Sequence, residues 1–493
     1  MDWSRQAQAL KIDTRAFVNG ARVEALSSGR FDSVNPHDGT IVASLPSCSE
    51  VEVDLAVKAA RQSFEDGAWS RISAYERGRV LLRLADEIAN TIEELSLLDS
   101  LEMGMPISNG LALGPAGVAE VRNVAEWVNK IAEELLSSGP HTLSLNLRNP
   151  HGVVAAISPW NFPFLIAMGQ TVSALAMGNS VVLKPSELAS LSSLRIGDLA
   201  IQAGIPAGVL NVVPGLGNET GRALAMHDDV DCLSFTGSTA TGRILMEYAA
   251  RSNLKAVLLE CGGKSPQIVF DDLSDLDALA QNLVQGFVWN SGQVCVAGTR
   301  ILVTRRLYEP LAERMAKIVG SLGSGAPLDP TTQLGPLASK AQFERVDRLV
   351  QGAKIGGGRL LAGGESDTAA GQCHFRPTLF ADLAPDHPLM QEEVFGPVAG
   401  LLPFDGVDQA LALANDTRYG LSATLWTNDF RLANGLVRRL HGGPITVNAV
   451  PVAKPSYVLG ASVEPVGASG FGAIGGVAGL HAYTRARNVT FNL

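Results

Sequence analysis

The stretch from residue 152 to residue 260 decides the fold, because short apolar strands alternate there with helical segments. The strands are GVVAAIS (152–158), SVVLKP (180–185), VLNVVPG (209–215), CLSFTG (232–237) and AVLLE (256–260). The helical segments between them are 163–177, 190–203 and two that begin near 220 and 241. Alternation at this spacing implies right-handed crossovers and therefore a parallel sheet. The fold class expected is α/β, with a Rossmann-like parallel-sheet domain.

Several polar or small residues follow these strands closely. They are Asn161, Lys184, Gly215, Thr236 and Glu260. The carboxyl ends of parallel strands meet at one edge of a sheet, and ligands bind at that edge. We therefore expect a ligand site where these residues stand.

A second alternation of strands and helices follows Gly262. It includes SPQIVF (265–270), RILVT (300–304) and PTLFADL (377–383), with helices expected over 276–289 and 307–320. This pattern predicts a second α/β domain over residues 263–463, and residues 1–136 and 151–262 are assigned to the first. In that first part we expect short strands over 17–45 and helices from 49, over 76–98 and over 115–136. Residues 137–150 and 478–493 alternate like exposed strands and are expected to form a small β element.

Size, charge and cysteine content exclude several classes of protein. A chain of 493 residues suggests about three domains, and 46% apolar with 18% charged residues is typical of a globular enzyme. A net charge of −10 argues against nucleic acid or an anionic membrane as the main partner. The N-terminus has no apolar signal core, and no window is long and apolar enough to span a membrane. Five scattered cysteines without zinc-type spacing predict reduced thiols in a cytoplasm and no metal site.

Cys295 lies in the segment FVWNSGQVCVAGTR (287–300), beside glycines that allow close approach of a bound molecule. A lone cysteine is more often a small buried hydrophobe than a nucleophile. Two other residues make this one a candidate: Glu260 closes an apolar strand, and Asn161 stands in PWNFP (159–163) after another. A thiol, a carboxylate and an amide at strand ends can serve as nucleophile, base and oxyanion donor.

Six segments together carry a resemblance to a known family. They are PWNFP (159–163), KPSE (184–187), FTGST (235–239), LECGGK (259–264), GQVC (292–295) and EEVFGPV (392–398). The six segments occur in family order, and the chain resembles the NAD(P)-dependent aldehyde dehydrogenase superfamily from near Phe17 to near Val489. The resemblance implies oxidation of a small-molecule aldehyde to its acid through a cysteine thiohemiacetal and thioester. It also implies a homodimer or homotetramer in which the small β element pairs with a neighbouring subunit. An ordinary hairpin edge is the alternative for that element, and a thiol hydrolase or acyltransferase without redox chemistry is the alternative for the activity.

The segments that could bind a cofactor differ in how specifically their sequences indicate such a site. Gly215 to Gly221 almost spells a dinucleotide fingerprint but has one residue too many, and Gly263-Lys264-Ser265 fails as a P-loop. FTGST ends a strand and opens a helix, which suits a pyrophosphate. Glu187 can accept both ribose hydroxyls and so favours NAD over NADP. With the family contacts added, the expected set is Ile157, Trp160, Lys184, Ser186, Glu187, Gly217, Thr236, Gly237, Ser238, Gly242, Cys261, Glu393 and Phe395.

The substrate side departs from the family pattern. Gln170 and Ile474 stand where many members have the Lys and Glu that relay the proton of the base. Gly169 replaces a common Trp, which predicts a wider tunnel for bulky or aromatic aldehydes, although the long loop 448–464 could refill the space. The overall character is nearest to the branch that oxidises amino-aldehydes. The expected pocket residues are Phe162, Leu165, Gly169, Trp289, Val294 and Val296.

Overall fold

The larger sheet contains the strands predicted from the 152–260 stretch. The computed structural model describes residues 2–26, 28–450 and 460–493. The strand order is β2-β1-β9-β8-β7-β10-β11-β21. The central five strands are parallel: β7 (Val153–Ile157), β8 (Ser180–Lys184), β9 (Leu210–Val212), β10 (Cys232–Thr236) and β11 (Ala256–Glu260). Antiparallel edges are added by β1 (Ala16–Val18), β2 (Ala21–Val23) and β21 (Gly470–Phe471). The predicted parallel sheet is confirmed.

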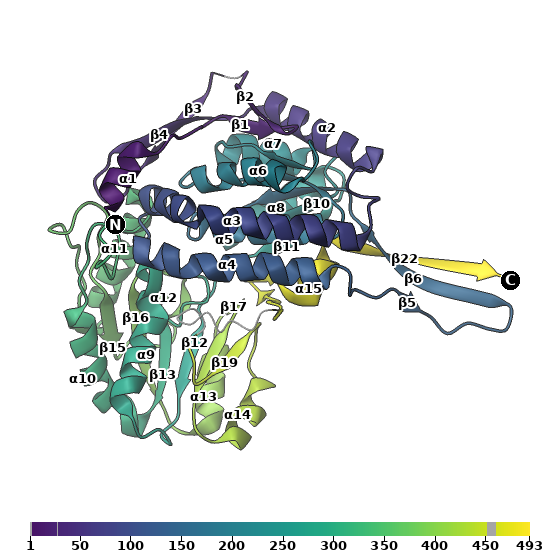
Figure 1. Ribbon diagram of the computed structural model, residues 1–493. Helices are drawn as coiled ribbons and strands as arrows, with labels where there is room; N and C mark the ends of the chain where they lie inside the picture. The colour runs from purple at the N-terminus through teal and green to yellow at the C-terminus, as the bar shows by residue number, and fades with distance from the viewer. Residues whose placement is uncertain (1, 27, 451–459) are drawn as a thin grey trace.

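Helices cover both faces of this sheet, so each central strand is buried on two sides (Figure 1). One face packs against α3 (Ala74–Met103), α4 (Ile107–Trp127), α5 (Pro163–Ala176) and α6 (Leu191–Ala203). The other packs against α2 (Glu50–Asp66), α7 (Arg222–Met226) and α8 (Thr239–Arg251). Alternate residues of a strand take opposite faces: Cys232 packs on the α5 side, and Leu233 packs on the α8 side.

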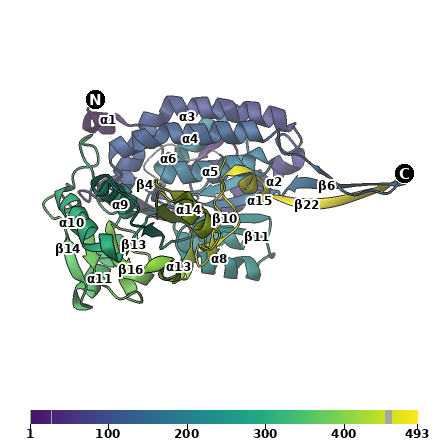
Figure 2. The same ribbon diagram turned by 90° about the horizontal axis from the view of Figure 1, so that it is seen from below.

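The helix expected over 115–136 was placed wrongly, because α4 spans Ile107–Trp127 and contains Pro115. Residues 134 and 135 form a short strand, β5 (Glu134–Leu135), instead. The start was missed because glycine and proline disfavour helix in isolation. Here Gly110 and Gly114 are buried and allow α4 to approach Ser96 and Ile92 of α3 closely. α3 and α4 lie side by side on the outside of this domain, as Figure 2 also shows.

The second sheet has the order β14-β15-β16-β13-β12-β18-β19. Its strands are β12 (Pro266–Val269), β13 (Arg300–Thr304), β14 (Arg359–Ala362), β15 (Thr378–Ala381), β16 (Val398–Phe404), β18 (Ala423–Trp426) and β19 (Ile445–Val447). One face carries α9 (Leu276–Val288) and α10 (Arg305–Ser321). The other carries α11 (Lys340–Ile355), α12 (Pro388–Gln391), α13 (Gly406–Asn415) and α14 (Phe430–Val437). Both domains are therefore three-layered, as the α/β class requires.

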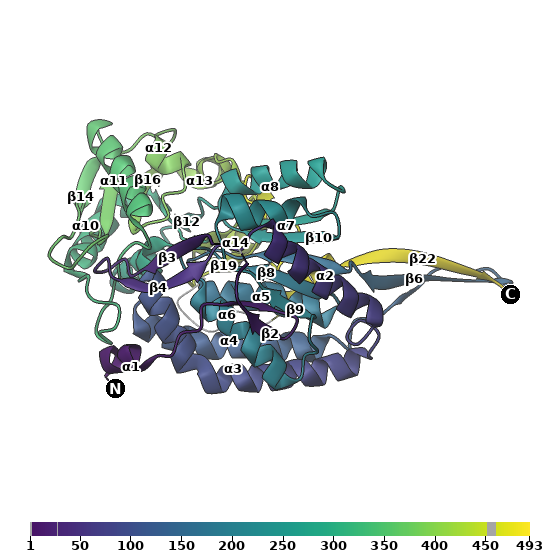
Figure 3. The same cartoon turned by 90° about the horizontal axis from the view of Figure 1, so that it is seen from above.

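A narrow arm leaves the body of the molecule and carries the C-terminus (Figures 1 and 3). It consists of β22 (Thr484–Asn492), β6 (Thr142–Pro150) and β5, with β6 in the middle. The remaining elements are α1 (Trp3–Ala9), the hairpin β3 (Arg30–Val34) and β4 (Ile41–Pro46), η1 (Gly217–Gly221), η2 (Trp289–Gly292), β17 (Tyr419–Gly420), β20 (Val466–Gly467) and α15 (Gly476–Ala482).

Three further expectations concern absences or the long loop. Within the described ranges no helix is long and apolar enough to cross a membrane. The same ranges contain no group of three or more His, Cys, Asp or Glu side chains placed to hold a metal ion. All five cysteines are free thiols. Of the long loop 448–464, residues 451–459 lie outside the described residues.

Candidate active site

A cleft of about 460 Å³ opens at the carboxyl end of the larger sheet. It is lined by the turn after β7, the junction of β10 with α8, the end of β11, the segment around Cys295 and the segment 392–395. Ten of the residues expected from the sequence meet there: Trp160, Asn161, Thr236, Gly237, Ser238, Glu260, Cys261, Cys295, Glu393 and Phe395. The three candidate catalytic residues therefore share one cavity with much of the expected cofactor set.

Cys295 is presented by a loop whose backbone is held in an unusual conformation. After α9 ends, Asn290 and Ser291 have φ values of 50° and 53°, which are left-handed. Gly292 follows with φ 71°, and a Cβ there would overlap the carbonyl of Gly396. Such conformations persist only where the surroundings enforce them, and they cluster at functional sites. Burial, together with the nearby carboxyl groups of Glu393 and Glu260, raises the pKa of the half-buried Cys295 thiol to about 12.

Asn161 is tied to this loop by two hydrogen bonds. Its Nδ2 donates to the carbonyl oxygen of Gln293 at 2.9 Å, and Nδ2 of Asn290 donates to the carbonyl oxygen of Asn161 at 3.0 Å. A side-chain amide has two N–H donors, so one remains for another acceptor. The pair of bonds fixes the turn after β7 relative to the thiol loop.

Glu260 is the last residue of β11 and is 8% exposed. Its Oε1 is buried and accepts no hydrogen bond from the described residues. Burial raises the pKa of this carboxyl to about 8, in the direction expected from its apolar setting. At neutral pH the group is therefore mostly protonated, and it can exchange a proton near pH 8.

The groups expected to hold a dinucleotide fit that task along the same edge of the sheet. α8 begins at Thr239, Ser238 caps it by accepting from the N–H of Thr241, and its first turn contains no acidic residue. The free N–H groups and the dipole of a helix N-terminus favour a phosphate. At the end of β8, Lys184 is 2% exposed, and its Nζ lies 3.3 Å from Oε2 of the half-exposed Glu187. Burial lowers the pKa of Lys184, and Glu187 opposes that effect.

The other end of the cleft holds Glu393 and Phe395. The N–H of Gly263 donates to Oε1 of Glu393 at 3.0 Å, and burial raises the pKa of Glu393 to about 7. The Phe395 ring meets Trp160 edge-on, with ring centroids 5.2 Å apart. A carboxyl group and an aromatic pair beside the thiol suit the ribose and ring of a nicotinamide.

Some expected residues lie outside this cleft. Ile157, Lys184, Ser186, Glu187, Gly217 and Gly242 do not line it. Gly217 stands beside Glu187, since a Cβ there would lie 4.0 Å from Oε1 of that residue. Gly242 packs against Cys261, where a Cβ would lie 2.9 Å from the sulfur. Gly242 therefore adjoins the cleft at Cys261, and Ile157 and Lys184 stand opposite each other at the ends of β7 and β8.

The expected substrate residues form one apolar cluster, with the exception of Gly169. The cluster contains Phe162, Leu165, Trp289, Val294 and Val296, together with Met103, Met105, Leu113, Trp160 and Ile166. The rings of Phe162 and Trp289 are stacked with centroids 5.4 Å apart. Gly169 lies two turns along α5 from Phe162, and a Cβ there would have no atom of the described residues within 4 Å. No described residue therefore fills the space beside this face of α5.

Residues 23–489 match the sequence model of the aldehyde dehydrogenase family. The chain belongs to this family. It is 41% identical to an aminoacetaldehyde dehydrogenase of Pseudomonas aeruginosa, over 96% of this chain and 94% of the relative. The structure superimposes with a TM-score of 0.97 on a mutant of the indole-3-acetaldehyde dehydrogenase AldA of P. syringae in complex with NAD+ and IAA, at 40% identity, covering 100% and 99% of the two chains. A γ-glutamyl-γ-aminobutyraldehyde dehydrogenase from Burkholderia cenocepacia gives a TM-score of 0.96 at 41% identity, covering 100% and 99%. The chain is an aldehyde dehydrogenase that uses NAD, as the sequence predicted.

Several lining residues of the dehydrogenase cleft were missed from the sequence. Gln342 on α11 donates to the carbonyl oxygens of Val394 and Phe395 at 3.0 and 2.8 Å, and Arg345 donates to the carbonyl oxygen of Glu393 at 2.6 Å. The others are Pro159, Ile166, Thr239, Ala240, Arg243, Gly262, Glu392, Arg418 and Tyr419. Gln342 and Arg345 stand three residues apart on a polar helix, which looks like any solvated surface. No local signal identified them.

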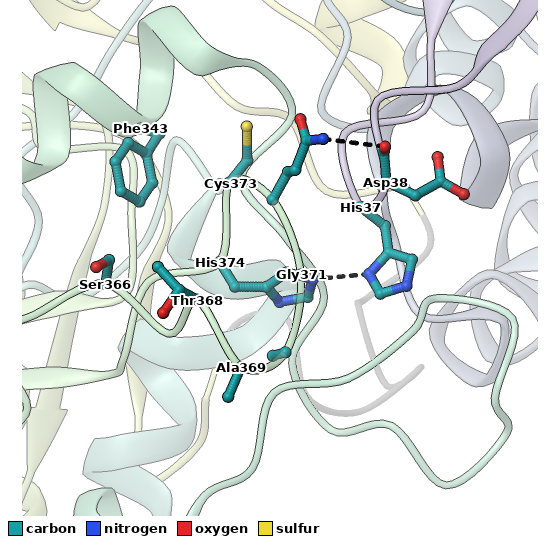
Figure 4. Close-up of a pocket in the computed structure, with 11 residues that line it drawn as sticks. His37, Asp38, Phe343, Ser366, Thr368, Ala369, Gly371, Cys373 and His374 are labelled. Carbon is teal, nitrogen blue, oxygen red and sulfur yellow. Dashed lines mark hydrogen bonds between the residues drawn. The ribbon is translucent and has the colours of Figure 1, made fainter.

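A second cavity of about 560 Å³ contains none of the predicted site residues (Figure 4). It lies between the turn of the β3–β4 hairpin and residues 366–374 of the second domain. Nδ1 of His37 lies 3.0 Å from Nε2 of His374 and joins the two segments. The cavity is separate in its residues from the dehydrogenase cleft.

The Asn290–Asn161 hydrogen bond gives a test of the thiol loop. Asn290→Gly keeps the left-handed backbone without strain and removes the amide, so we expect roughly a tenfold loss of NADH formation. Asn290→Ala removes the same amide and adds about 1 kcal/mol of backbone strain, so its thermal midpoint should fall below that of Asn290→Gly. Aldehyde-dependent NADH absorbance and thermal melts measure both effects. Wild-type turnover in Asn290→Gly would mean that this bond does not hold Asn161 in place.

Proposed function

We propose that the dehydrogenase oxidises its aldehyde on Cys295, with Asn161 as oxyanion donor and Glu260 as base. One observation carries the proposal: the three side chains come from separate parts of the chain and line one cleft. Only a reaction at a shared carbonyl makes use of a thiol, an amide and a titratable carboxyl together.

The first step is addition of sulfur to the aldehyde carbonyl. With a pKa of about 12 the thiol is protonated at neutral pH, and only a thiolate is a good nucleophile. Glu260 lies in the same cleft with a pKa of about 8 and can take the thiol proton when ionised. The C–S bond forms as the carbonyl π bond breaks, and the charge on oxygen is held by Asn161 Nδ2 and the Cys295 N–H. One such donor is worth about 3–4 kcal/mol in the transition state.

The second half of the reaction converts the thiohemiacetal to the acid. NAD, when bound, accepts the hydride that leaves the thiohemiacetal carbon, and a thioester remains on Cys295. The residues expected to hold this cofactor are those at the N-terminus of α8, at the end of β8 and at Glu393 and Phe395. The proton that Glu260 took from the thiol leaves to solvent before the thioester is hydrolysed. The ionised Glu260 then takes a proton from water as the water oxygen attacks the thioester, and passes it to the departing sulfur. The C–S bond breaks, the carboxylic acid leaves, and the thiol is restored.

Cys295 is needed to form any NADH, whereas Glu260 takes a proton in both halves of the reaction, so their variants should fail differently. Cys295→Ala is expected to form no NADH from an aldehyde. Glu260→Gln should form up to one NADH per site in a burst that is slower than in the wild type, because an amide cannot take the thiol proton, followed by a steady rate about 10²–10⁴ lower than wild type. In the wild type the steady rate should rise with pH through about 8, because only the ionised form of Glu260 accepts a proton.

Rapid-mixing absorbance over a pH series measures both phases, with acetaldehyde and phenylacetaldehyde as substrates. Substantial turnover by Cys295→Ala, or a wild-type steady rate in Glu260→Gln, contradicts the assigned roles. Ester hydrolysis without any NADH from aldehydes would favour the thiol hydrolase alternative.

The proposed substrate is a bulky, largely apolar aldehyde. Phe162, Trp289 and Leu165 belong to an apolar cluster beside the thiol loop, and no residue that the structure describes fills the space next to Gly169. An apolar wall gains about 25 cal/mol for each Å² of apolar substrate surface that it removes from water. A relative that is named for indole-3-acetaldehyde agrees with this class, and relatives named for aminoacetaldehyde and γ-glutamyl-γ-aminobutyraldehyde make amino-aldehydes the second group to test.

Gly169→Trp tests the width of the tunnel. An indole placed on this face of α5 should lower kcat/KM for phenylacetaldehyde at least tenfold relative to acetaldehyde, because the larger substrate loses its space. Gly169→Ala is the matched control and should leave both values near wild type, since its Cβ meets no atom of the described chain within 4 Å. Aldehyde panels read by NADH absorbance, with 3-aminopropionaldehyde included, give the ratios. An unchanged ratio in Gly169→Trp would exclude Gly169 from the substrate path.

We also propose that the arm is the contact through which the enzyme forms a homodimer or homotetramer. β22 pairs with β6 over nine residue pairs, yet the arm projects away from the body and most of β22 is exposed. An exposed strand edge readily pairs with another chain. A cytoplasmic location, expected from the free thiols, stays a prediction.

Sedimentation velocity tests the assembly. The wild type should sediment at a multiple of the 51.8 kDa chain mass, and a chain that ends before Thr484 should sediment at a lower multiple. Circular dichroism of the shortened chain checks that it is folded. A wild-type particle of single-chain mass contradicts the proposal.

A further inference from the structure

Gln170 lies at the centre of a buried polar network beside the sheet. Its side chain is carried by α5, and the residue is 2% exposed. Nε2 donates to Oγ of Ser234 and to Oγ1 of Thr236, both at 3.3 Å. Ser234 Oγ lies 2.9 Å from the hydroxyl oxygen of Tyr483, which is 2% exposed. Two hydroxyls of β10 therefore use the amide nitrogen and leave the amide oxygen free for another group.

Glu260 projects from the same face of the sheet toward α5. β10 and β11 are parallel, with Thr236 opposite Glu260 and Ser234 opposite Leu258. Residues opposite each other on adjacent strands point to the same face and are about 5 Å apart. The packing agrees, because Leu258 joins the apolar cluster of α5, whereas Leu259 joins the cluster on the α8 side. Burial raises the pKa of Tyr483, and the charge of Glu260 adds to that rise.

Two buried oxygen atoms in this region lack partners. Among the residues that the structure describes, neither Oε1 of Gln170 nor Oε1 of Glu260 makes a hydrogen bond. An amide oxygen is an acceptor only, whereas a protonated carboxyl offers one O–H donor. A buried polar group without a partner is costly, so the acid form of Glu260 and the amide oxygen of Gln170 complement each other.

We propose that Gln170 is a positioning residue whose amide oxygen accepts a hydrogen bond from protonated Glu260 and holds the carboxyl against α5 between turnovers. Ser234 and Thr236 fix the amide in the orientation that presents its oxygen. When Glu260 loses its proton the bond is lost, and the carboxylate is released toward the thioester. The inference deepens the proposed function, because it rests on the role of Glu260 as the base.

The sign of the effect follows from which form of Glu260 is bound. A hydrogen bond to the neutral acid favours that form and raises its pKa. Gln170→Met keeps the length of the side chain and removes the acceptor, so the pKa of Glu260 should fall. The pH at which deacylation becomes half-maximal should move down by about half to one unit. An amide that donated to the carboxylate would have the opposite effect.

The probe is p-nitrophenyl acetate, which isolates deacylation from hydride transfer. Its ester carbonyl acetylates Cys295 and releases nitrophenol in a burst, and water then releases acetate from the thioester in the steady phase. Other titratable or charged groups also face the cleft or Glu260: Cys261, Cys295, Glu393, Tyr483, Glu392, Arg243, Arg345 and Arg418. The burst rate reports proton transfer from the thiol before acylation, and the Glu260→Gln variant decides whether the pH dependence of the steady phase belongs to Glu260.

Four variants of the full-length enzyme complete the experiment, each profiled from pH 5.5 to 9.5. Gln170→Met should lower the pH at which the steady-phase rate is half-maximal and leave the burst amplitude unchanged. Ser234→Ala, which frees the amide, should lower that pH less. Tyr483→Phe keeps both contacts of Gln170 and should not change the half-maximal pH. Glu260→Gln should abolish the rise of the steady-phase rate with pH.

The outcomes separate the inference from the proposed function. A steady-phase rate that still rises with pH in Glu260→Gln overturns the role of Glu260 as base. The inference on Gln170 alone is overturned if the rise of the steady-phase rate with pH is lost in Glu260→Gln, but its half-maximal pH is unchanged or higher in folded Gln170→Met. If Gln170→Met has a lower thermal midpoint but the same half-maximal pH of the steady phase, the residue has a structural role only. That result also overturns the inference.

Discussion

The parallel pairing of β7, β10 and β11 is the constraint on which the rest of the site depends. Because all three strands run in the same direction, Asn161, Thr236 and Glu260 reach one edge of the sheet although about 100 residues separate the first from the last. Each central strand is buried on both faces, so a slip by one residue would turn Glu260 to the α8 side. The core that excludes such a slip thereby orients the carboxyl group.

Burial also sets the electrostatic state of the cleft. It raises the pKa values of Cys295, Glu260 and Glu393 to about 12, 8 and 7, and the carboxylates reinforce the effect on the thiol. At neutral pH the thiol and Glu260 therefore hold their protons. A resting thiol is protected from oxidation, since susceptibility follows thiolate character. Binding of a positively charged ligand would favour the ionised forms of all three groups.

The parts of the molecule that could be predicted from sequence are those in which local pattern and global structure agree. The strand–helix alternation of 152–260 and the residues that follow its strands were predicted correctly, because strand direction alone places them. α4 was misplaced because the close approach of Gly110 and Gly114 to α3 is a tertiary effect that outweighs propensity. Gln342 and Arg345 were missed because they act on carbonyl oxygens of a segment about 50 residues away. The hydrogen bonds of Gln170 were also beyond the sequence, which indicated only that a lysine was replaced.

The two sides of the reaction centre are supported by different kinds of structure. Glu260 stands on a strand in the middle of a packed sheet, where neighbouring strands and α5 restrict its position. Cys295 stands on a loop with left-handed residues, tied down by Gly292 against Gly396 and by Asn290 against Asn161. A base that must act on sulfur, then on water, needs a side chain that changes partner, whereas a nucleophile that carries the acyl group needs a fixed position. The strained loop gives the sulfur that fixed position, and the unpaired carboxyl oxygen gives the base its freedom.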